Sequence, residues 1–474
     1  MDGLECSEVL YSKLEDSCRV DAELYQHKYV KLNEFAETHE CTFFVNECDI
    51  IKKGIFSISA ACYSSAGVPF VRISNLKEMF ISTEDIVLIP DSENDKHIDT
   101  ELHEGDIILS KTGSPAASYV DIPQCNVSQD TVAISLKQNS KICSEYVVAY
   151  LNTKYGLAQM QKRFTGNIQT HLNLGDCKTK LIIPLFGRGF QDAIAEQFLT
   201  ALNHRRLAVQ SYEKATATLS SVLDINIAPK SSINSRIMSL KNSFALTGRL
   251  DAEYYQSKYD SYYASLAKFD STCIPNEFDV LKNSGTNYAE CISDVGVIKT
   301  KQLTNSGVNT DGVESYFTNE VCTQNKSTFI ENNDVIFASM GVGSLGKVSL
   351  FSYDGDRPFV TDSTLRIYRA KKTACILPEV LCVFLQSTVC QELIYRYVVG
   401  STGIINIYDD DIAKIPIPVL DAAIQKDIAE KVQESFALRR QSKQLLEHAK
   451  QAVEMAIEQG EDAALVWLKE RSGE

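Results

Sequence analysis

Two stretches, QDAIAEQF from Gln191 and QKDIAEKV from Gln425, begin the same kind of long helix. Each starts a run in which apolar or small residues recur at alternating steps of four and three, the a/d spacing of a coiled-coil seam. The first run ends near Leu223 and the second near Gln459. The pattern predicts two helices that pair with each other. The simpler alternative is two amphipathic helices that each pack on a separate domain.

The two seams align at an offset of 234 residues, which places Arg205 of the first on Arg439 of the second. A charge at the same step of both seams is expected to fix antiparallel register, or else to meet a carboxylate of a partner protein. The residues predicted to form the coiled-coil and partner interface are Ile194, Phe198, Arg205, Tyr212 and Leu219 in the first helix and Ile428, Val432, Arg439, Leu446 and Val453 in the second.

The duplication extends beyond the helices. RVDAELYQHKY from Arg19 and RLDAEYYQSKY from Arg249 are identical at eight of eleven positions. Each is followed by strand-like blocks and one predicted helix, in the same order. The matched blocks are FVRISNL (70–76) and VIKTKQL (297–303), GDIILSKTG (105–113) and NDVIFASMG (333–341), VSQDTVAISL (127–136) and VTDSTLRIYR (360–369), and the helices 144–164 and 378–398.

The predicted fold class is therefore α/β in the mixed α+β sense, with an internal pseudo-twofold repeat. Each half is a mixed globular domain followed by a long helix, and the two long helices pair as an antiparallel coiled coil. The predicted boundaries are 1–186 for the first domain, 187–224 for the first long helix, 225–248 for a linker, 249–420 for the second domain, and 421–474 for the second long helix with its C-terminal tail.

Composition is that of an ordinary globular protein, with 44% hydrophobic and 23% charged residues in 474. No apolar stretch reaches the length of a membrane span, and the N-terminus lacks the features of a secretory signal. Fourteen cysteines include no CxxC pair, so we expect reduced thiols in a cytoplasmic protein and no metal site. The net charge of −15 disfavours a generic polyanion binder, but a locally basic face remains possible.

GVGSLGKV, from Gly341 to Val348, satisfies both GxGxxG and GxxxxGK after a strand-like run. A phosphate loop also requires a Ser or Thr after the Lys and a following helix. Here Val348 follows Lys347, and the next residues are strand-like. A tight β-turn that presents Lys347 is favoured over a nucleotide-binding enzyme. No HExxH, GxSxG or Asp-Pro-Pro-Tyr-type methyltransferase motif occurs, so we predict no catalytic residues and no enzyme activity in this chain.

Polar and basic side chains recur at matched positions in predicted turns of both halves. Side chains of these types donate to phosphates and to base edges, although polar loop tips of any soluble domain would also contain them. The recurrence favours DNA binding. The candidates are Arg72, Asn75, Lys77, Lys111, Lys162, Arg163, Asn167 and Gln169 in the first half and Lys299, Lys301, Gln302, Lys347, Arg396 and Thr402 in the second.

Taken together, the duplicated halves, the GDIILSKTG and NDVIFASMG strand-turn blocks, the segment IPIPVLDAAIQKDIAEKV from Ile415 and the tandem helices resemble the specificity (S) subunit of type I restriction–modification systems. The resemblance covers nearly the whole chain and rests on order and duplication. It implies two target-recognition domains that each read one part of a bipartite double-stranded DNA site. It also implies two adenine-methyltransferase subunits, and restriction or translocase subunits, as partners. S-adenosylmethionine, ATP and magnesium are then expected on those partners, and no cofactor on this chain.

In such a protein the long helices would act as a spacer. The first seam, from Ile194 to Val222, spans about 42 Å at 1.5 Å per residue, on the order of one turn of B-DNA. The sequence pI of about 5.1 is unusual for a DNA-binding protein. We therefore expect weak DNA binding by the chain alone and strong binding in complex. A coiled-coil adaptor without a nucleic-acid role is the other alternative.

Overall fold

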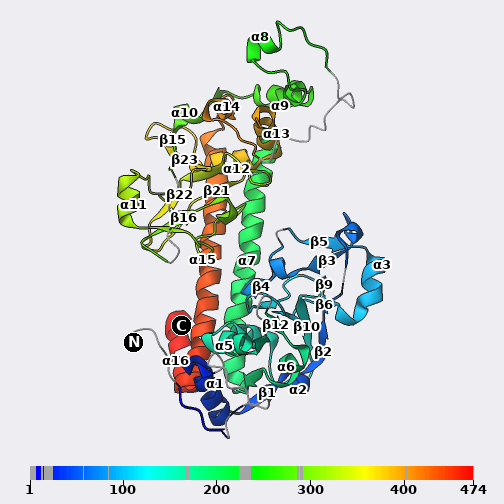
Figure 1. Ribbon diagram of the computed structural model, residues 1–474. Coiled ribbons are helices and arrows are strands. Elements are labelled where there is room, and N and C mark those ends of the chain that lie inside the picture. Colours follow the sequence, from blue (N-terminus) through cyan, green and yellow to red (C-terminus); the bar gives the residue numbers. More distant parts are fainter. Residues whose placement is uncertain are drawn as a thin grey trace. The chain divides into compact units, whose positions relative to one another are not determined.

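A computed structural model describes residues 7–11, 14, 25–56, 58–83, 85–165, 170–223, 236–284, 288, 292–400 and 404–472. The chain forms two compact units. Unit 1 contains residues up to Arg205 and from Arg440 onward, and unit 2 contains Arg206–Arg439. The two long helices, α7 (Arg188–Val222) and α15 (Ala422–Gln459), each contribute one segment to either unit (Figure 1).

Unit 1 contains two sheets. The first has the strand order β2-β10-β7-β8-β4 and the second β5-β3-β9-β6. The strands of the first are β2 (Cys48–Lys53), β10 (Thr131–Leu136), β7 (Ile107–Ser110), β8 (Ala117–Tyr119) and β4 (Met79–Phe80). Those of the second are β5 (Val87–Ile89), β3 (Val68–Val71), β9 (Gln124–Val127) and β6 (Leu102–His103). Two short pairs complete the unit: β1 (Cys41–Phe43) with β13 (Ile182–Pro184), and β11 (Phe164–Thr165) with β12 (His171–Leu172).

Unit 2 repeats this arrangement. Its larger sheet has the order β15-β23-β20-β21, antiparallel throughout, as β2-β10-β7-β8 is in unit 1. The other sheet of each unit contains one parallel pair, β3 with β9 in unit 1 and β16 with β22 in unit 2. The strands are β15 (Phe278–Leu281), β23 (Leu365–Ala370), β20 (Val335–Ala338), β21 (Val348–Leu350), β19 (Tyr316–Phe317), β16 (Val295–Ile298), β22 (Phe359–Thr361), β14 (Ser271–Thr272), β24 (Ile417–Pro418), β17 (Leu303–Thr304) and β18 (Gly307–Val308).

The helices of unit 1 other than α7 and α15 are α1 (His27–Thr38), α2 (Phe44–Glu47), α3 (Asp91–Asn94), α4 (Ser144–Leu151), α5 (Lys154–Arg163), α6 (Leu174–Thr179) and α16 (Glu461–Ser472). Those of unit 2 are α8 (Phe244–Thr247), α9 (Lys258–Leu266), α10 (Ile274–Glu277), α11 (Asn319–Gln324), α12 (Pro378–Gln386), α13 (Thr388–Tyr397) and α14 (Asp409–Ile412). Helix α4 and helix α12 are the most apolar of these, and their side chains fill the cores of the two units.

The helices predicted over 144–164 and 378–398 are each broken in two. Thr153 begins α5 because its Oγ1 accepts a hydrogen bond from the backbone N–H of Gly156 at 3.2 Å. Ser387 begins α13 in the same way, through the N–H of Cys390 at 3.3 Å. A hydroxyl at an N-cap accepts from a first-turn N–H that the helix beginning there would leave without a partner, so each break is stabilised locally.

The entry to each long helix is built by the same glutamine. Gln191 Oε1 accepts from the N–H of Cys143 at 3.2 Å, and Gln425 Oε1 accepts from the N–H of Leu377 at 3.1 Å. The Nε2 of each donates at 2.9 Å to a carbonyl five residues earlier, that of Phe186 or Leu420. Both glutamines are almost fully buried, so their amides fix where each helix leaves its globular domain.

Within each unit the segments of α7 and α15 run antiparallel. In unit 2, Ser435 Oγ donates to the carbonyl of Ala208 at 2.6 Å, and further along α7 Thr218 contacts Asp427. In unit 1, Ser442 Oγ donates to the carbonyl of Ala201 at 2.7 Å. Ala201 and Ala208 are 234 residues before Ser435 and Ser442, so the two serine bonds are equivalent contacts of the repeat. The predicted antiparallel pairing of two long helices in a mixed α/β fold is confirmed.

Candidate nucleic-acid interface

The first pair of predicted DNA-binding turns has the same internal structure in both units. In unit 1, Asn75 Oδ1 accepts from the N–H of Arg72 at 3.1 Å, and its Nδ2 donates to the carbonyl of Ser82 at 3.2 Å. In unit 2, Gln302 Oε1 accepts from the N–H of Lys299 at 3.0 Å, and its Nε2 donates to the carbonyl of Gly312 at 2.6 Å. Each amide stabilises a 3₁₀ turn that directly follows β3 or β16.

These turns also shorten the predicted strands. The sequence patterns 70–76 and 297–303 alternate as strands do, but β3 ends at Val71 and β16 at Ile298. Asn75 and Gln302 are 1% and 2% exposed, with both ends of each amide hydrogen-bonded inside the protein. These two amides therefore position the turn, and the side chains that remain available to a ligand are those of its basic residues.

The basic residues of the two turns differ in their surroundings. Arg72 donates to the carbonyl of Asp85 at 2.6 Å, whereas Lys299 lies over the ring of Tyr288, with Nζ 4.0 Å from its centroid. Lys301 is ion-paired with Glu314 on the surface. Lys77 is exposed and forms no ion pair with any residue that the structure describes. Among these residues Lys77 thus presents its charge most directly to solvent.

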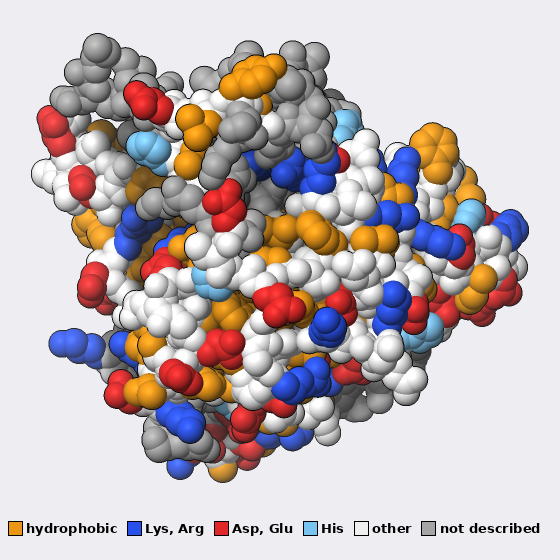
Figure 2. Space-filling view, turned by 90° about the horizontal axis from the view of Figure 1, so that it is seen from below, with side chains coloured by type: hydrophobic (Ala, Val, Ile, Leu, Met, Phe, Trp, Pro, Cys, Tyr) orange, Lys and Arg blue, Asp and Glu red, His pale blue; other side chains and the backbone are white. Residues whose placement is uncertain are grey.

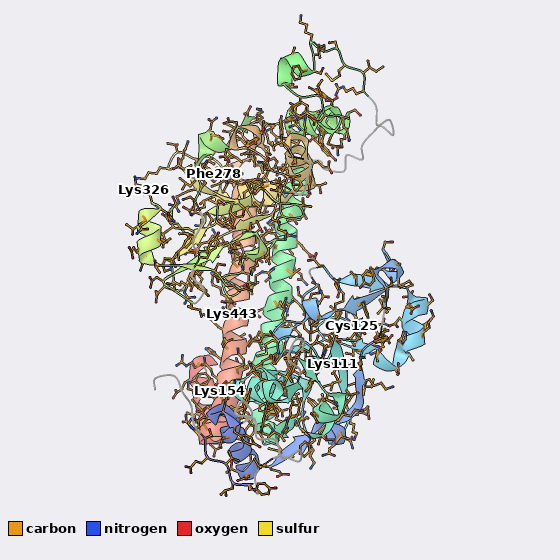
Figure 3. All side chains as sticks on the ribbon, in the orientation of Figure 1. Lys111, Cys125, Lys154, Phe278, Lys326 and Lys443 are labelled. Carbon is orange, nitrogen blue, oxygen red and sulfur yellow. The ribbon has the colours of Figure 1, made fainter. Side chains whose placement is uncertain are left out.

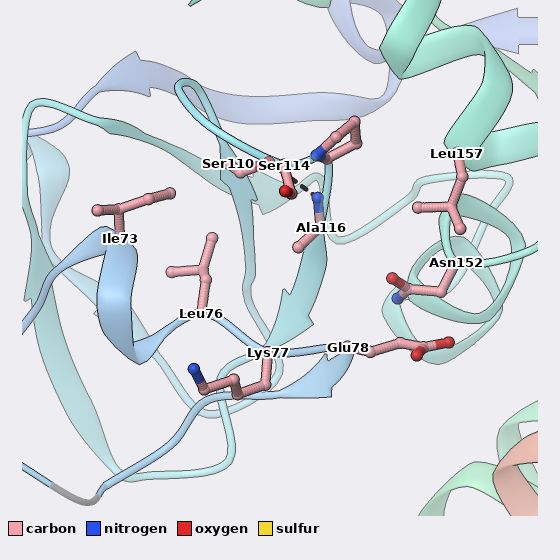
Figure 4. Close-up of a pocket in the computed structure, with 10 residues that line it drawn as sticks. Ile73, Leu76, Lys77, Glu78, Ser110, Ser114, Ala116, Asn152 and Leu157 are labelled. Carbon is pink, nitrogen blue, oxygen red and sulfur yellow. Dashed lines mark hydrogen bonds between the residues drawn. The ribbon is translucent and has the colours of Figure 1, made fainter. Parts of the chain in front are cut away.

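Lys77 lies at the rim of a pocket of about 350 Å³ in unit 1 (Figure 4). Its apolar wall includes Leu76 and Leu157, and polar atoms come from Asn152 and Ser110. Asn152 Nδ2 donates to the carbonyl of Ala117 at 2.8 Å, and Ser110 Oγ accepts from the N–H of Ala116 at 2.8 Å. These contacts fix the walls of the pocket between the β7–β8 turn, the β4 edge and α5.

The corresponding place in unit 2 is occupied by side chains. The repeat is marked here by matching hydrogen bonds: Ser118 Oγ donates to the carbonyl of Lys77, and Ser349 Oγ to that of Thr304. Gln391, 234 residues after Leu157, donates to the carbonyl of Gly346 at 2.8 Å. Beside it Leu345 is 5% exposed and packs in the core.

The turn from Gly341 to Lys347 is therefore part of the fold of unit 2. Gly341, Gly343 and Gly346 all have positive φ, which glycine adopts without strain. Strand β21 follows directly, so the turn does not lead into a helix as a phosphate loop does. Lys347 is exposed, with its backbone N–H donating to the carbonyl of Ser344 at 3.0 Å. This is the geometry of a tight β-turn that presents a lysine.

In unit 1 Lys111 directly follows strand β7 (Figure 3). Its N–H donates to the carbonyl of Asp130 and its own carbonyl accepts from Leu172, both at 2.8 Å. Partial burial lowers the pKa of Lys111, and the positive charge of Lys53 lowers it further, although Asp130 acts in the opposite direction. Lys53 was not among the sequence candidates. The sequence feature that points to Lys53 is its position at the end of the strand-like run CDIIKK.

The remaining candidates lie near helix ends. Lys162 is 7% exposed and Arg163 is partly buried at the end of α5. Arg396 is partly buried among tyrosines, with its guanidinium 4.7 Å from the ring of Tyr254 and its Nε donating to the carbonyl of that residue at 3.1 Å. Asn167, Gln169 and Thr402 lie outside the described residues. Their roles in DNA binding stay predictions.

The predicted coiled-coil residues divide between the two cores. Ile194, Phe198 and Val453 are fully buried in unit 1, and Leu446 packs at the edge of the same core. In unit 2 the buried residues are Tyr212, Leu219, Ile428 and Val432. Arg439 is partly buried. A role of any of these residues in binding a partner protein stays a prediction.

Arg205 makes its described contacts with the globular part of unit 1. It donates to the carbonyl of Ile81 at 2.8 Å and lies 3.8 Å from Asp121, with its guanidinium 5.0 Å from the ring centroid of Phe80. The arginine therefore joins α7 to the edge of the sheet. Whether it also sets the helix register stays a prediction.

Charges of both signs are interspersed over the surface in view in Figure 2. Among the residues that the structure describes, no cluster of three or more His, Cys, Asp or Glu side chains is arranged to hold a metal ion. No helix in this part of the chain is long and apolar enough to cross a membrane.

Comparison with known proteins finds a family match in the second half of the chain. Residues 252–448 match the family model described as "Type I restriction modification DNA specificity domain". This range contains the larger sheet of unit 2, α12, α13 and much of α15. Residues 252–448 are thus similar to a DNA specificity domain, and over this range the resemblance to type I restriction–modification specificity subunits is confirmed. The search of curated proteins found no match.

Solved structures with similarity include the S subunit of a type I restriction–modification system from M. genitalium, at 13% identity and a TM-score of 0.34, covering 89% of this chain and 96% of that one. The HsdS subunit of Thermoanaerobacter tengcongensis aligns at 11% identity and a TM-score of 0.28, covering 89% and 97%. A structure described as the basis of complex assembly and conformational transition of the type I R-M system aligns at 12% and 0.28, covering 89% and 98%. These TM-scores are too low to carry an assignment.

Proposed function

We propose that this chain is a non-catalytic subunit that recognises a bipartite double-stranded DNA site, one part with each unit. The observation that most directly supports this proposal is the structural duplication. The family match covers residues in the second half, and unit 1 repeats the strand order and the capping amides found there. Matched turns held by equivalent amides favour the same kind of ligand in both copies, with sequence preference set by the side chains that differ.

The proposal includes partners. Adenine-methyltransferase subunits would be brought to the DNA site by this chain, and restriction or translocase subunits would join the complex. S-adenosylmethionine, ATP and magnesium would then be bound by those subunits. Helices α7 and α15, which both run through the two units, would act as the spacer between the readers. The formal net charge of −15 favours DNA binding as a complex, because the isolated chain repels a polyanion at long range.

The test is co-expression of this chain with the adenine-methyltransferase subunit of its own system, followed by sequencing that detects N6-methyladenine. One motif with two specific parts and a fixed gap is expected. Methylation at a single uninterrupted motif would contradict two-part reading. Absence of any methylation that depends on this chain would contradict the role as specificity subunit and favour an adaptor without nucleic-acid contact.

The spacer part of the proposal has a separate test. Adding seven residues to both helices, one insertion in the unit 1 segment of α7 and one in the facing segment of α15, preserves the heptad pattern. The gap between the two methylated parts is expected to change while the parts themselves stay the same. Altered parts with an unaltered gap would contradict the spacer role and leave the recognition role intact.

A further inference from the structure

A small cationic and aromatic surface in unit 1, formed by Lys53, Phe56 and Lys111, has no role in the fold described so far. Strands β2 and β7 flank β10, and Val132 of β10 pairs with both Lys53 and Leu109. Side chains of directly paired residues share a face, and positions two apart in a strand share it again. Lys53 and Lys111 therefore project from the same face at the same end of the sheet.

The two lysines are held close together without an ion-pair partner among the described residues. The charge of Lys53 contributes to the lowered pKa of Lys111, which reports their proximity. Asp130 is the one carboxylate that counteracts this effect at Lys111. In a chain with a formal net charge of −15, two neighbouring lysines without an ion-pair partner among the described residues indicate a site for an anionic ligand.

Phe56 adds an apolar surface beside these charges. Its side chain is 71% exposed, and Lys53 Nζ lies 5.0 Å from the centre of its ring. The backbone beneath is anchored, because Ile55 is 4% exposed and its N–H donates to the carbonyl of Val127 at 2.8 Å. Gly54 allows this close approach, since a Cβ there would lie 2.2 Å from the carbonyl oxygen of Ser128. The exposed ring thus directly follows an anchored stretch of backbone.

We propose that Lys53, Phe56 and Lys111 form an anchor for the backbone of double-stranded DNA, with the lysines on phosphates and the Phe56 ring against the sugar edge. A duplex fits this surface because it offers closely spaced phosphates beside apolar sugar faces. The anchor supplies affinity and position without reading sequence. This inference rests on the proposed DNA-recognition function.

The anchor belongs to one unit. At the corresponding strand end of unit 2, Asn283 stands at the position of Lys53 and is buried, with its Nδ2 donating to the carbonyl of Thr328 at 2.9 Å. The position equivalent to Lys111 is Ser339. The neighbouring Arg366 is ion-paired with Asp409 at 2.7 Å. Unit 1 is therefore expected to carry the larger share of the sequence-independent contact at this place.

The experiment measures DNA affinity of the complete complex with its methyltransferase partner at several salt concentrations, on the methylated duplex and on an unrelated one. Removing one phosphate contact lowers the log–log salt slope by about 0.9. Lys53→Gln and Lys111→Gln are each expected to weaken binding equally on both duplexes. When salt is raised from about 50 to 200 mM, each variant should lose affinity by a factor that is about 3.5 times smaller than the factor lost by the unaltered complex. Phe56→Ala is expected to weaken binding with an unaltered slope.

Lys52→Gln is the matched control. Lys52 is adjacent in sequence, faces the other side of β2 and is ion-paired with Asp99 at 2.8 Å. The Lys52→Gln variant loses the same charge, and its salt slope should equal that of the unaltered complex. A slope that is unaltered in both Lys53→Gln and Lys111→Gln would overturn the anchor, even if affinity fell. If the unaltered complex bound neither duplex, the DNA-recognition function itself would fail, and the anchor with it.

Discussion

Units 1 and 2 share a scaffold but differ at one turn, which connects β7 to β8 in unit 1 and β20 to β21 in unit 2. In unit 1 the β7–β8 turn is short and leaves a pocket lined by Leu76, Leu157 and Asn152. In unit 2 the longer β20–β21 turn places Leu345 in the core and is held by Gln391. A hollow surface and a filled one are thus built on the same strand order. The hydrogen bonds found in both units thus maintain the shared fold, whereas the length of the turn decides whether the surface beside it is hollow or filled.

The largest effect is expected where the two units differ in packing against the long helix. The ring centroid of Phe198 is 5.0 Å from that of Phe80 and 5.2 Å from that of Tyr119. The equivalent seam residue in unit 2 is Val432. Phe198→Ala should lower the free energy of unfolding by about 3–5 kcal/mol, and Val432→Ala by about 2 kcal/mol, because the larger side chain leaves the larger cavity. Urea unfolding measures both; equal losses would contradict the packing difference.

Substitution of the amides of Asn75 and Gln302 tests whether the turn that they stabilise has only a structural role in both units. Asn75→Ala and Gln302→Ala should each lower the free energy of unfolding by about 1–3 kcal/mol, because each leaves buried backbone groups without a partner. The methylated motif of the complex should stay the same in both variants. A changed base preference in either would show that the amide reads DNA, and would separate the two units in function.

The difference between hollow and filled turns has its own test. Gln391→Leu removes the hydrogen bonds to the carbonyls of Gly346 and Leu385 and places at this position the residue that unit 1 has at 157. We expect a loss of about 1 kcal/mol and faster amide hydrogen exchange in the β20–β21 turn. The reciprocal Leu157→Gln is the matched control and should leave exchange in the unit 2 turn unaltered. Unaltered exchange in Gln391→Leu would mean that core packing of Leu345 alone holds the turn.

The smallest effect is expected from a pair of equivalent carboxylates. Burial tends to raise the pKa of Glu47 and of Glu277, but hydrogen bonds outweigh it and the net pKa is lowered in both. Glu47 accepts from Thr42 and from the N–H of Lys141, and Glu277 from Thr272 and from the N–H of Cys375. A lowered folded pKa contributes stability above the unfolded value, which is lost as pH falls through the folded pKa.

Acid unfolding measures this contribution. Glu47→Gln and Glu277→Gln should each make stability less dependent on pH below about 4.5, with similar effects because the two sites share their hydrogen-bond pattern. Dissimilar pH dependence in the two variants would mean that the repeat is less equivalent in solution than its hydrogen bonds indicate.

Much of the fold is determined by local patterns in the sequence. The a/d steps that begin at Gln191 and Gln425 predict two long helices, and the duplicated blocks predict two similar mixed domains. These features depend on periodicity, which is a property of neighbouring residues. The breaks at Thr153 and Ser387 were missed because an apolar helical period outweighs a single hydroxyl in a sequence window, although that hydroxyl is an N-cap in the fold.

The candidate site depended much more on tertiary structure. Asn75, Gln302 and Arg396 have side chains suited to DNA, but the structure places the two amides inside turns and the guanidinium among tyrosines. Lys53 and Lys111 are far apart in sequence and meet only because β2 and β7 both pair with β10. Residue type and order were thus readable from the chain alone. Which polar groups are already hydrogen-bonded, and which charges share a face, was decided by contacts between residues distant in sequence.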